Sequence, residues 1–184
     1  MFPRDPDAAL IRRIADGDEA AAKMFVTRKL QRVLALAYRI CGDQAEAEDV
    51  AQDVFVRVWK YARSWKSDDA KVDTWLHRIV LNVCQDRLAA SHRRHESGAM
   101  ELDALADQAP TPEDTAAGQS MRARIWQALL ALPVRQREAL VLTYYQELSN
   151  VEAAAAMQVS VEAVESLLAR ARRTLKQRLL DIAG

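Results

Sequence analysis

Hydrophobic residues recur along most of this chain at the spacing of amphipathic helices, with polar residues at the intervening positions. Three long stretches of the first half carry such stripes: Phe25, Leu30, Val33, Leu34 and Tyr38; then Val50, Val54, Phe55, Val58 and Trp59; then Trp75, Ile79, Val83 and Leu88. Each stripe can bury one face of a helix against its neighbours. No segment alternates apolar and polar residues as a half-buried strand does. The pattern therefore predicts an all-α fold.

Capping signals mark the ends of these predicted helices. Aspartate is favoured at helix N-caps, proline in the first turn and glycine just after the last turn. In chain order the signals are Asp5 with Pro6, Gly17, Asp18, Gly42 and Asp43. In the second half, Thr111–Pro112 could start a helix that continues to Leu132, and Pro133 begins the next one. Each half is thus predicted to be a series of consecutive helices.

Residues 96–119, ESGAMELDALADQAPTPEDTAAGQ, interrupt the helical pattern. They hold six acids and no base, two prolines and few large apolar residues. This composition is typical of a linker. It separates residues 1–95 from residues 120–184, and each block is near the lower size limit for an independent fold. The sequence therefore predicts two small helical domains joined by an acidic linker.

A helix-turn-helix pattern lies in the second block. Ser149 and Glu152 have the spacing of a capping box, which predicts a short helix over Asn150 to Met157. After a three-residue turn, Ser160 is the predicted N-cap of a longer helix. Its buried stripe is predicted to be Val161, Val164, Leu168, Ala171 and Leu175. The second helix of such a motif enters the DNA major groove, but an antiparallel helical hairpin with solvated arginines fits the pattern equally well.

The formal net charge is zero, but the charge is unevenly distributed. Residues 43–53 hold five acids and no base, whereas residues 76–95 hold four arginines, one aspartate and all three histidines. Residues 160–184 hold five bases and three acids. A neutral total argues against a basic coat over the whole molecule, and the segments predict separate acidic and basic surfaces.

The cysteines and hydrophobic runs bear on the compartment. Cys41 and Cys84 have no CxxC spacing and lie within apolar helical patterns, so we expect reduced core residues. No run approaches the roughly 20 apolar residues of a membrane span, and MFPRDPDAAL lacks the apolar core of a signal peptide. These features predict a cytoplasmic protein without membrane insertion.

No pattern typical of enzymes is present in the sequence. It has no Gly-rich phosphate loop, no serine in an elbow motif and no pair of carboxylates with a catalytic pattern. His92 and His95 do not combine with either cysteine at the spacing of known zinc ligands. We therefore expect a protein that is not an enzyme and that has no cofactor and no metal site.

Residues 132–179 closely resemble the fourth conserved region of bacterial sigma factors of the extracytoplasmic-function group. The matching positions are Leu132–Pro133, Arg137, Leu148–Ser149, Glu152–Ala153, Val159–Ser160, Val164, Ser166, Arg170, Ala171 and Arg172. In that family the second helix of the motif reads the minus-thirty-five promoter element. The resemblance implies that this element contacts Ser160, Glu162, Glu165, Ser166, Ala169, Arg170, Arg172 and Arg173.

Glu165 departs from the family pattern, because many relatives have a basic residue there and another at the position of Leu167. A carboxylate in the major groove repels phosphate but can accept a hydrogen bond from N4 of cytosine. We therefore expect Glu165 to read a base, with Arg170, Arg172 and Arg173 contacting phosphates or guanine. Fewer phosphate contacts also predict weak DNA affinity for this domain alone.

The stretch AEAEDVAQDVFVRVWKYARSW, residues 45–65, resembles the family segment that grips the clamp helices of core RNA polymerase. The resemblance implies polymerase contacts at Asp49, Gln52, Asp53, Phe55 and Trp59. Charge complementarity between an acidic helix and a basic partner helix would set the register of binding. Phe55 also fits the hydrophobic core, so Asp49, Gln52 and Asp53 are the stronger candidates.

The stretch WKSDDAKVDTWLHRIVLNVCQDRLAASHRRH, residues 65–95, resembles the family segment that melts the promoter and reads its minus-ten element. Trp75, Leu76, Arg78, Ile79, Asn82, Asp86 and Arg87 fall in register with the family pattern. The resemblance implies minus-ten contacts at Trp65, Lys66, Ser67, Lys71, Trp75, Arg78, Asn82, Arg87, Arg93 and Arg94. Aromatic platforms, amides and cations suit single-stranded DNA, and a flipped base needs a pocket, which we assign to residues 65–73.

Alternatives remain open at several of these positions. Trp75, on an apolar helix, fits the core as well as a stacking platform, and Asp86 fits an ion pair with Arg87 or another neighbour. At the level of the whole chain, an ordinary dimeric helix-turn-helix regulator and a helical scaffold without a DNA role are the rivals. The acidic surface around Asp49 and the two-domain organisation argue against the first rival.

The resemblance as a whole implies a two-domain, all-α alternative sigma factor. Residues 1–95 would form a region 2 helical bundle, residues 96–119 the linker and residues 120–184 a region 4 helix-turn-helix domain. The partners implied are the clamp helices and flap of core RNA polymerase, promoter DNA, and an anti-sigma factor covering both domains. The linker would follow the polymerase toward the RNA exit path, where its negative charge mimics nucleic acid.

Overall fold

The computed structural model describes residues 5–66, 71–96 and 116–181, and these are helices and their connections with no strand among them. The helices of the first block are α1 (Ala8–Ala15), α2 (Glu19–Cys41), α3 (Gln44–Tyr61), the 3₁₀ turn η1 (Ala62–Ser64) and α4 (Val72–Glu96). Those of the second block are α5 (Ala116–Leu130), α6 (Val134–Leu140), the π-helical turn η2 (Val141–Tyr145), α7 (Asn150–Met157) and α8 (Val161–Asp181). The all-α prediction is confirmed.

Most predicted caps are confirmed. Asp18 accepts a hydrogen bond from the backbone N–H of Ala21 at 3.0 Å, and Asp43 accepts one from Glu46 at 2.7 Å. Gly17 and Gly42 follow α1 and α2 with φ of 87° and 83°, in the left-handed region that glycine adopts without strain. The two loops that connect α1 to α2 and α2 to α3 can therefore be short.

The prediction for the first helix was wrong in its start. α1 begins at Ala8, with Asp7 at the N-cap position and no side-chain cap bond. The Asp5 carboxylate instead accepts the N–H of Asp7 at 3.0 Å and the N–H of Val72, the first residue of α4, at 2.6 Å. A distant helix thus uses the aspartate, because the free N–H groups at its N-terminus need acceptors.

The second block follows the predicted order of helices. The capping box between Ser149 and Glu152 is present, and α7 has the predicted bounds. Pro133 lies at the N-cap of α6, and α5 ends at Leu130, two residues before the predicted end. α5 begins at Ala116, inside the segment predicted as linker, whereas the predicted helix start at residues 111–112 lies outside the described residues.

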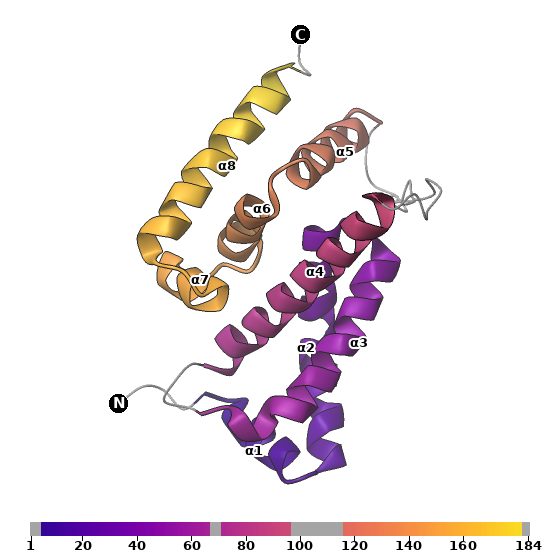
Figure 1. The fold of residues 1–184 in the computed structure, drawn as a ribbon, viewed down its shortest axis with the longest axis vertical. Helices are drawn as coiled ribbons and strands as arrows, with labels where there is room; N and C mark the ends of the chain where they lie inside the picture. The colour runs from indigo at the N-terminus through magenta and orange to yellow at the C-terminus, as the bar shows by residue number, and fades with distance from the viewer. Residues whose placement is uncertain (1–4, 67–70, 97–115, 182–184) are drawn as a thin grey trace.

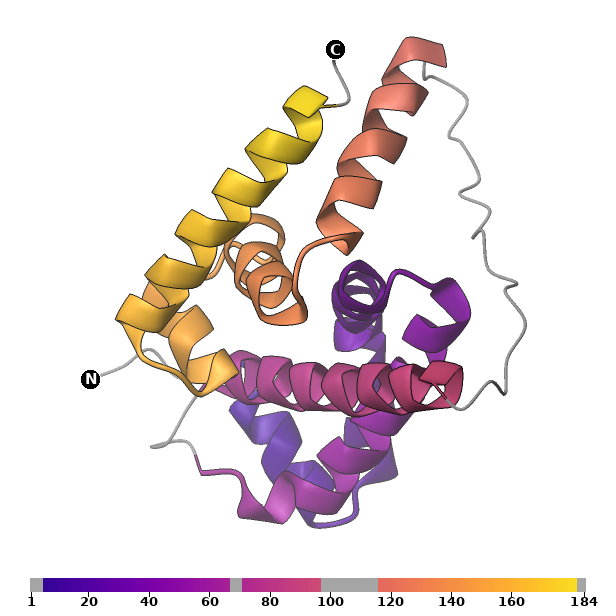
Figure 2. The ribbon, with the colours of Figure 1, turned by 45° about the horizontal axis from the view of Figure 1, so that its top comes forward.

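The two blocks share one hydrophobic core. α2, α3 and α4 pack side by side with α1 across one end, and α8 lies on the far side of α5, α6 and α7 (Figure 1). α7 packs against the N-terminal part of α4 (Figure 2). The Tyr38 ring of α2 stacks on Trp126 of α5 at a centroid distance of 4.7 Å, and Arg39 lies 4.5 Å from the centre of the Tyr145 ring. The second block therefore covers one side of the first.

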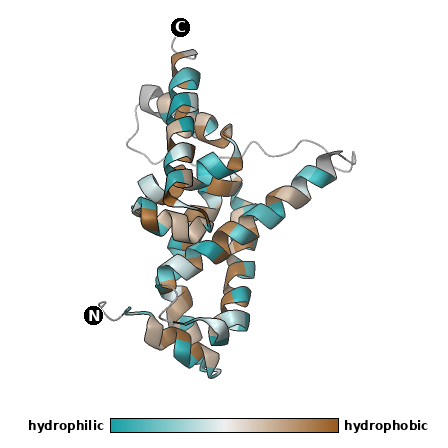
Figure 3. Cartoon of the chain, turned by 60° about the vertical axis from the view of Figure 1, so that its left-hand side comes forward, coloured by the Kyte–Doolittle hydropathy of each residue, from teal (hydrophilic) through white to brown (hydrophobic). Residues whose placement is uncertain are grey.

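α8 is amphipathic, and its turns alternate between hydrophilic and hydrophobic colours (Figure 3). Of the predicted stripe, Val164, Leu168 and Ala171 are buried, and Val161 and Leu175 are half-buried against the core. The opposite face therefore remains open to solvent along most of the helix.

Candidate nucleic-acid and partner interfaces

An acidic surface lies on α3, where Asp49 and Gln52 are exposed and Asp53 is half-exposed. Arg87 of α4 binds it: its guanidinium donates to Asp49 Oδ2 and to Asp53 Oδ2, both at 2.9 Å. Glu46 Oε2 lies 3.5 Å from the same guanidinium. The hydrogen bond to Asp53 raises the pKa of Arg87, and Asp49 adds to the effect. A residue predicted to contact phosphate is thus joined to the acids predicted to contact polymerase.

The apolar members of the predicted polymerase surface separate into two kinds. Phe55 is 5% exposed and meets Phe25 edge to face at 6.4 Å, so the alternative that it is a core residue is correct. Trp59 is 45% exposed. It lines an open, mostly apolar hollow of about 770 Å³ together with side chains of α1 and α2, including Ile14 and Val26. The folded α3 therefore presents Trp59 but not Phe55 to a partner.

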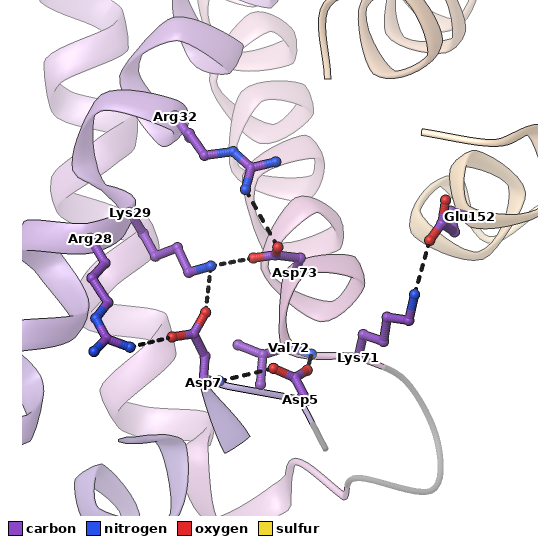
Figure 4. Close-up of polar contacts among 9 residues, drawn as sticks. All are labelled: Asp5, Asp7, Arg28, Lys29, Arg32, Lys71, Val72, Asp73 and Glu152. Carbon is purple, nitrogen blue, oxygen red and sulfur yellow. Dashed lines mark hydrogen bonds and ion pairs between the residues drawn. The ribbon is translucent and has the colours of Figure 1, made fainter. Parts of the chain in front are cut away.

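The start of α4 is fixed by a network of charges (Figure 4). Lys29 of α2, only 7% exposed, places its Nζ 2.6 Å from Asp7 Oδ2 and 2.6 Å from Asp73 Oδ1. Arg28 pairs with Asp7 at 3.0 Å, and Arg32 with Asp73 at 3.4 Å. The network joins α1, α2 and α4 beside the loop that precedes α4.

The charges in this network are mutually stabilised. Burial opposes the charge on Lys29, but its hydrogen bonds to Asp7 and Asp73 outweigh burial and raise its pKa. Burial likewise acts to raise the pKa of Asp73, and the bond from Lys29 outweighs it, so that the pKa is lowered. Both groups therefore stay ionised near neutral pH.

The predicted minus-ten residues fall along the end of η1, the following loop and α4. Trp65 and Trp75 are half-buried against the core, which favours the core alternative for Trp75. Lys66, Lys71, Asn82 and Arg93 are exposed and Arg78 is half-buried. Ser67 lies outside the described residues, as does the side chain of Arg94. Asp86 pairs with Arg57 at 2.9 Å, so a neighbour of α3 rather than Arg87 is its partner.

Two of these residues contact the second block. Lys71 Nζ lies 3.2 Å from Glu152 Oε1, and Arg78 Nη2 donates to the backbone oxygen of Ala155 at 3.4 Å. Both partners belong to α7, the first helix of the helix-turn-helix. In this arrangement α7 therefore covers part of the predicted minus-ten surface.

Farther along α4, a polar contact that the sequence did not predict joins the two blocks, and we call the surface on which the second block packs against α2 and α4 the seam. Glu138 of α6 is fully buried, and its Oε1 accepts a hydrogen bond from Gln85 Nε2 at 2.7 Å. Arg135 binds its other oxygen at 2.9 Å and the backbone oxygen of Met157 at 3.1 Å. Burial raises the pKa of Glu138, and the bonds from Gln85 and Arg135 oppose that shift. Of these contacts, only the ion pair between Arg135 and Glu138 could have been recognised in the sequence, because the two residues have the i,i+3 spacing of neighbours on a helix.

The predicted minus-thirty-five residues lie at or near the exposed face of α8. Ser160 caps the helix by accepting the N–H of Ala163 at 3.2 Å. The other candidates are all exposed: Glu162, Glu165, Ser166, Ala169, Arg170, Arg172 and Arg173. Arg172 donates from Nε to the Tyr144 hydroxyl at 3.0 Å and lies over that ring. The helix thus offers one continuous polar face, in which Arg172 is already oriented.

Two negative findings concern the described residues alone. None of the helices in residues 5–66, 71–96 and 116–181 is long and apolar enough to cross a membrane. No group of three or more His, Cys, Asp or Glu residues within those ranges is arranged to hold a metal ion.

The chain matches two family descriptions. Residues 25–94 match sigma-70 region 2, and residues 122–175 match sigma-70 region 4. NccH from Alcaligenes xylosoxydans xylosoxydans, an RNA polymerase sigma factor, is 36% identical over 92% of each chain. The extracytoplasmic-function sigma factor SigW of Bacillus subtilis is 31% identical over 94% of this chain and 96% of its own. The RNA polymerase sigma-H factor of Pseudomonas aeruginosa is 29% identical over 97% and 96%.

Solved structures agree with these matches. CnrH, in complex with the cytosolic domain of CnrY, is 30% identical and superposes with a TM-score of 0.68 over 97% of this chain and 99% of its own. The sigma factor RpoE of Bartonella quintana, at 23% identity, supports the fold with a TM-score of 0.70 over 85% and 95%. With both sigma-70 regions present in order, the chain belongs to the extracytoplasmic-function RNA polymerase sigma factors.

Proposed function

We propose that this sigma factor reads the minus-thirty-five element with the exposed face of α8. The orientation of α8 supports this proposal, because its apolar stripe is buried while Glu165, Arg170 and Arg173 face solvent. A recognition helix needs such a free face to enter the major groove. Glu165 would accept from a cytosine N4, and Arg170 and Arg173 would bind phosphate or guanine.

Core polymerase would bind to α3 through Asp49, Gln52, Asp53 and the exposed Trp59. The carboxylates supply charge complementarity to a basic helix, and Trp59 with its neighbouring hollow supplies apolar contact. Arg87 holds Asp49 and Asp53 in a fixed position at 2.9 Å each, so the acidic surface is preorganised. We assign polymerase binding to residues 1–95 and minus-thirty-five binding to residues 120–184, joined by residues 96–119.

Minus-ten recognition would require the two blocks to separate. Lys71 and Arg78, predicted to bind single-stranded DNA, are engaged by α7. DNA and α7 would compete for these side chains, so the described arrangement is one that does not engage the promoter. Binding to polymerase would favour an open form, since the two promoter elements must be reached at once.

An anti-sigma factor is the regulator we propose. CnrH, which is 30% identical to this chain, has been solved with the cytosolic domain of CnrY. A regulator of that kind would stabilise the closed arrangement, in which α7 packs on α4 and engages Lys71 and Arg78. As a transcription initiation factor that is not a catalyst, the protein would act in the cytoplasm with the polymerase.

Run-off transcription with purified core polymerase and genomic fragments tests these roles. Arg170→Ala and the double variant Asp49→Ala/Asp53→Ala should abolish or strongly reduce new transcripts. Arg178→Ala on α8 and Glu48→Ala on α3 are matched exposed controls that should retain them. If the protein drove no transcripts and bound no core without an inhibitor present, the initiation role would be refuted. Promoter binding by a dimer without polymerase would favour the stand-alone regulator.

A further inference from the structure

Two consecutive tyrosines, Tyr144 and Tyr145, are exposed at the end of the π-helical turn η2, at 57% and 45%. Val141 and Leu142, at the start of the same turn, are fully buried and anchor it in the core. The backbone N–H of Gln146 donates to the oxygen of Val141 at 3.1 Å, which is the i→i+5 bond of a π-helix. Such turns are rare and occur frequently at functional sites. Packing in the core therefore does not account for the two exposed rings.

The two rings contact arginines of different blocks. The Tyr145 ring lies under Arg39 of α2, with the guanidinium carbon 4.5 Å from the ring centre, so this contact crosses the seam. The Tyr144 hydroxyl accepts a hydrogen bond from Nε of Arg172 of α8 at 3.0 Å. The guanidinium carbon of Arg172 lies 5.8 Å from the centre of the Tyr144 ring. Both members of this second contact belong to the second block, so it can persist when the blocks separate for promoter binding.

The hydroxyl of Tyr144 engages only one edge of the Arg172 guanidinium. A guanidinium carries N–H donors on Nε and on both Nη atoms, in a planar fork that matches the oxygens of a phosphate. The bond to Tyr144 uses Nε and leaves the Nη donors available. Among the residues that the structure describes, no carboxylate pairs with Arg172. An arginine held in this way is preorganised for an anion, because it has less side-chain entropy to lose on binding.

The position of Arg172 on α8 favours contact with a phosphate over contact with a base. The N-terminal residues of a recognition helix contact base edges, and Glu165 lies in that part of α8. Arg172 follows Glu165 by seven residues, so it lies on the same edge of the exposed face, about 10 Å farther along the helix axis. Arg172 is next to the buried Ala171, whereas Arg173 lies near the centre of the exposed face. A side chain at the edge of that face reaches the DNA backbone beside the groove.

We propose that Tyr144 is a positioning residue for promoter binding, whose hydroxyl holds Arg172 so that its Nη groups bind one phosphate beside the minus-thirty-five element. The inference rests on the proposed reading of promoter DNA by α8, and it adds a residue that precedes the helix-turn-helix in the chain. Phosphate contacts fix the register of a protein on the duplex but carry no sequence information. Tyr144 therefore strengthens binding to every base variant of the element alike.

Binding of the holoenzyme, formed from core polymerase and this protein, to a fluorescein-labelled duplex tests the proposal. The duplex carries the upstream half of a promoter found by run-off transcription and lacks the minus-ten half, so only contacts near the minus-thirty-five element contribute. Tyr144→Phe keeps the ring and removes the hydroxyl, and it should weaken binding about three- to tenfold for all base variants of the element. Tyr145→Phe, whose ring contacts Arg39 instead, is the matched control and should bind as the wild type does.

A double-mutant cycle and the salt dependence of binding separate positioning from a general structural effect. Arg172→Ala should weaken binding about ten- to a hundredfold and reduce the slope of log K against log salt concentration by about 0.9, the value for one phosphate. Adding Tyr144→Phe to Arg172→Ala should cost nothing more. Adding it to Arg170→Ala should cost as much as in the wild type, because Arg170 is about 200° away from Arg172 around the helix.

Several outcomes would overturn the proposal. These are an equal cost of Tyr144→Phe with and without Arg172, a changed preference at a single base pair, or an unchanged salt slope for Arg172→Ala. If Arg170→Ala weakened binding and Tyr144→Phe did not, the role of Tyr144 would be refuted while the reading of DNA by α8 would stand. If the wild-type holoenzyme bound the duplex no better than one of shuffled sequence, both proposals would be refuted.

Discussion

Replacing Lys29 by methionine should remove the cation that joins the start of α4 to α1 and α2. Methionine keeps most of the volume of the buried stem, so the change is mainly one of charge. It leaves Asp7 nearly buried with only Arg28 as an ion-pair partner, while Asp73, which is more exposed, keeps Arg32. Breaking one partner of a buried pair costs roughly 3–5 kcal/mol. Because Asp7 keeps a partner, we expect the lower end, about 3 kcal/mol, or roughly a hundredfold in the unfolding equilibrium.

Urea unfolding followed by circular dichroism measures this cost. Lys23→Met, at an exposed position of the same helix, is the matched control and should change the free energy of unfolding by less than about 0.5 kcal/mol. Adding Asp7→Asn to Lys29→Met should recover part of the loss, since the nearly buried carboxylate that has lost one of its two cations is then removed. A cost below about 1 kcal/mol for Lys29→Met with an unchanged m-value would refute the reasoning.

Three further predictions concern the same structure. The pKa of Lys29 is raised by folding, so the stability that Lys29 contributes is complete below its pKa in the unfolded chain and is lost as pH rises through its pKa in the folded chain. The pKa of Asp73 is lowered by folding, so the stability that Asp73 contributes is lost as pH falls through its pKa in the folded chain. Urea titrations from acid to alkaline pH should show both losses, and Lys29→Met should lack the alkaline one. Glu165→Ala should relax base preference at one promoter position by about 1–3 kcal/mol, seen in binding to all four base variants with polymerase present; an unchanged preference would exclude base reading. Gln85→Leu should leave Glu138 short of one hydrogen bond and weaken the seam by about 1–3 kcal/mol. The affinity of the protein for single-stranded minus-ten DNA, measured by fluorescence anisotropy, should then rise. An unchanged affinity and an unchanged radius of gyration would show that the seam does not limit the access of DNA to the minus-ten surface.

The local structure was predictable because short-range signals determine it. The capping box at Ser149 and Glu152 and the aspartates before α2 and α3 satisfy backbone groups within three residues, so their partners are visible in the sequence. Asp5 shows where this reasoning fails. Its carboxylate can cap either the nearby turn or a helix brought near by folding, and here it binds Val72, 67 residues away.

The candidate surfaces were predictable only in part. The exposed face of α8 follows directly from helical periodicity. The pairing of Arg87 with Asp49 and Asp53, and of Gln85 with Glu138, depends on the packing of separate helices, which no periodicity in the sequence encodes.

The composition of the seam suggests how the closed arrangement can be both specific and reversible. Its outer contacts, Lys71 with Glu152 and Arg78 with Ala155, are exposed or partly exposed, and such contacts contribute about 0–1 kcal/mol each. DNA phosphates can replace them at little cost. The inner contact is buried: Glu138 is bound by Gln85 and Arg135. When the blocks part, Glu138 loses the hydrogen bond from Gln85, and a bond to a charged group contributes about 1.5–3 kcal/mol. A regulator that breaks the buried contact of α6 would therefore shift the arrangement more than one that breaks the polar contacts of α7.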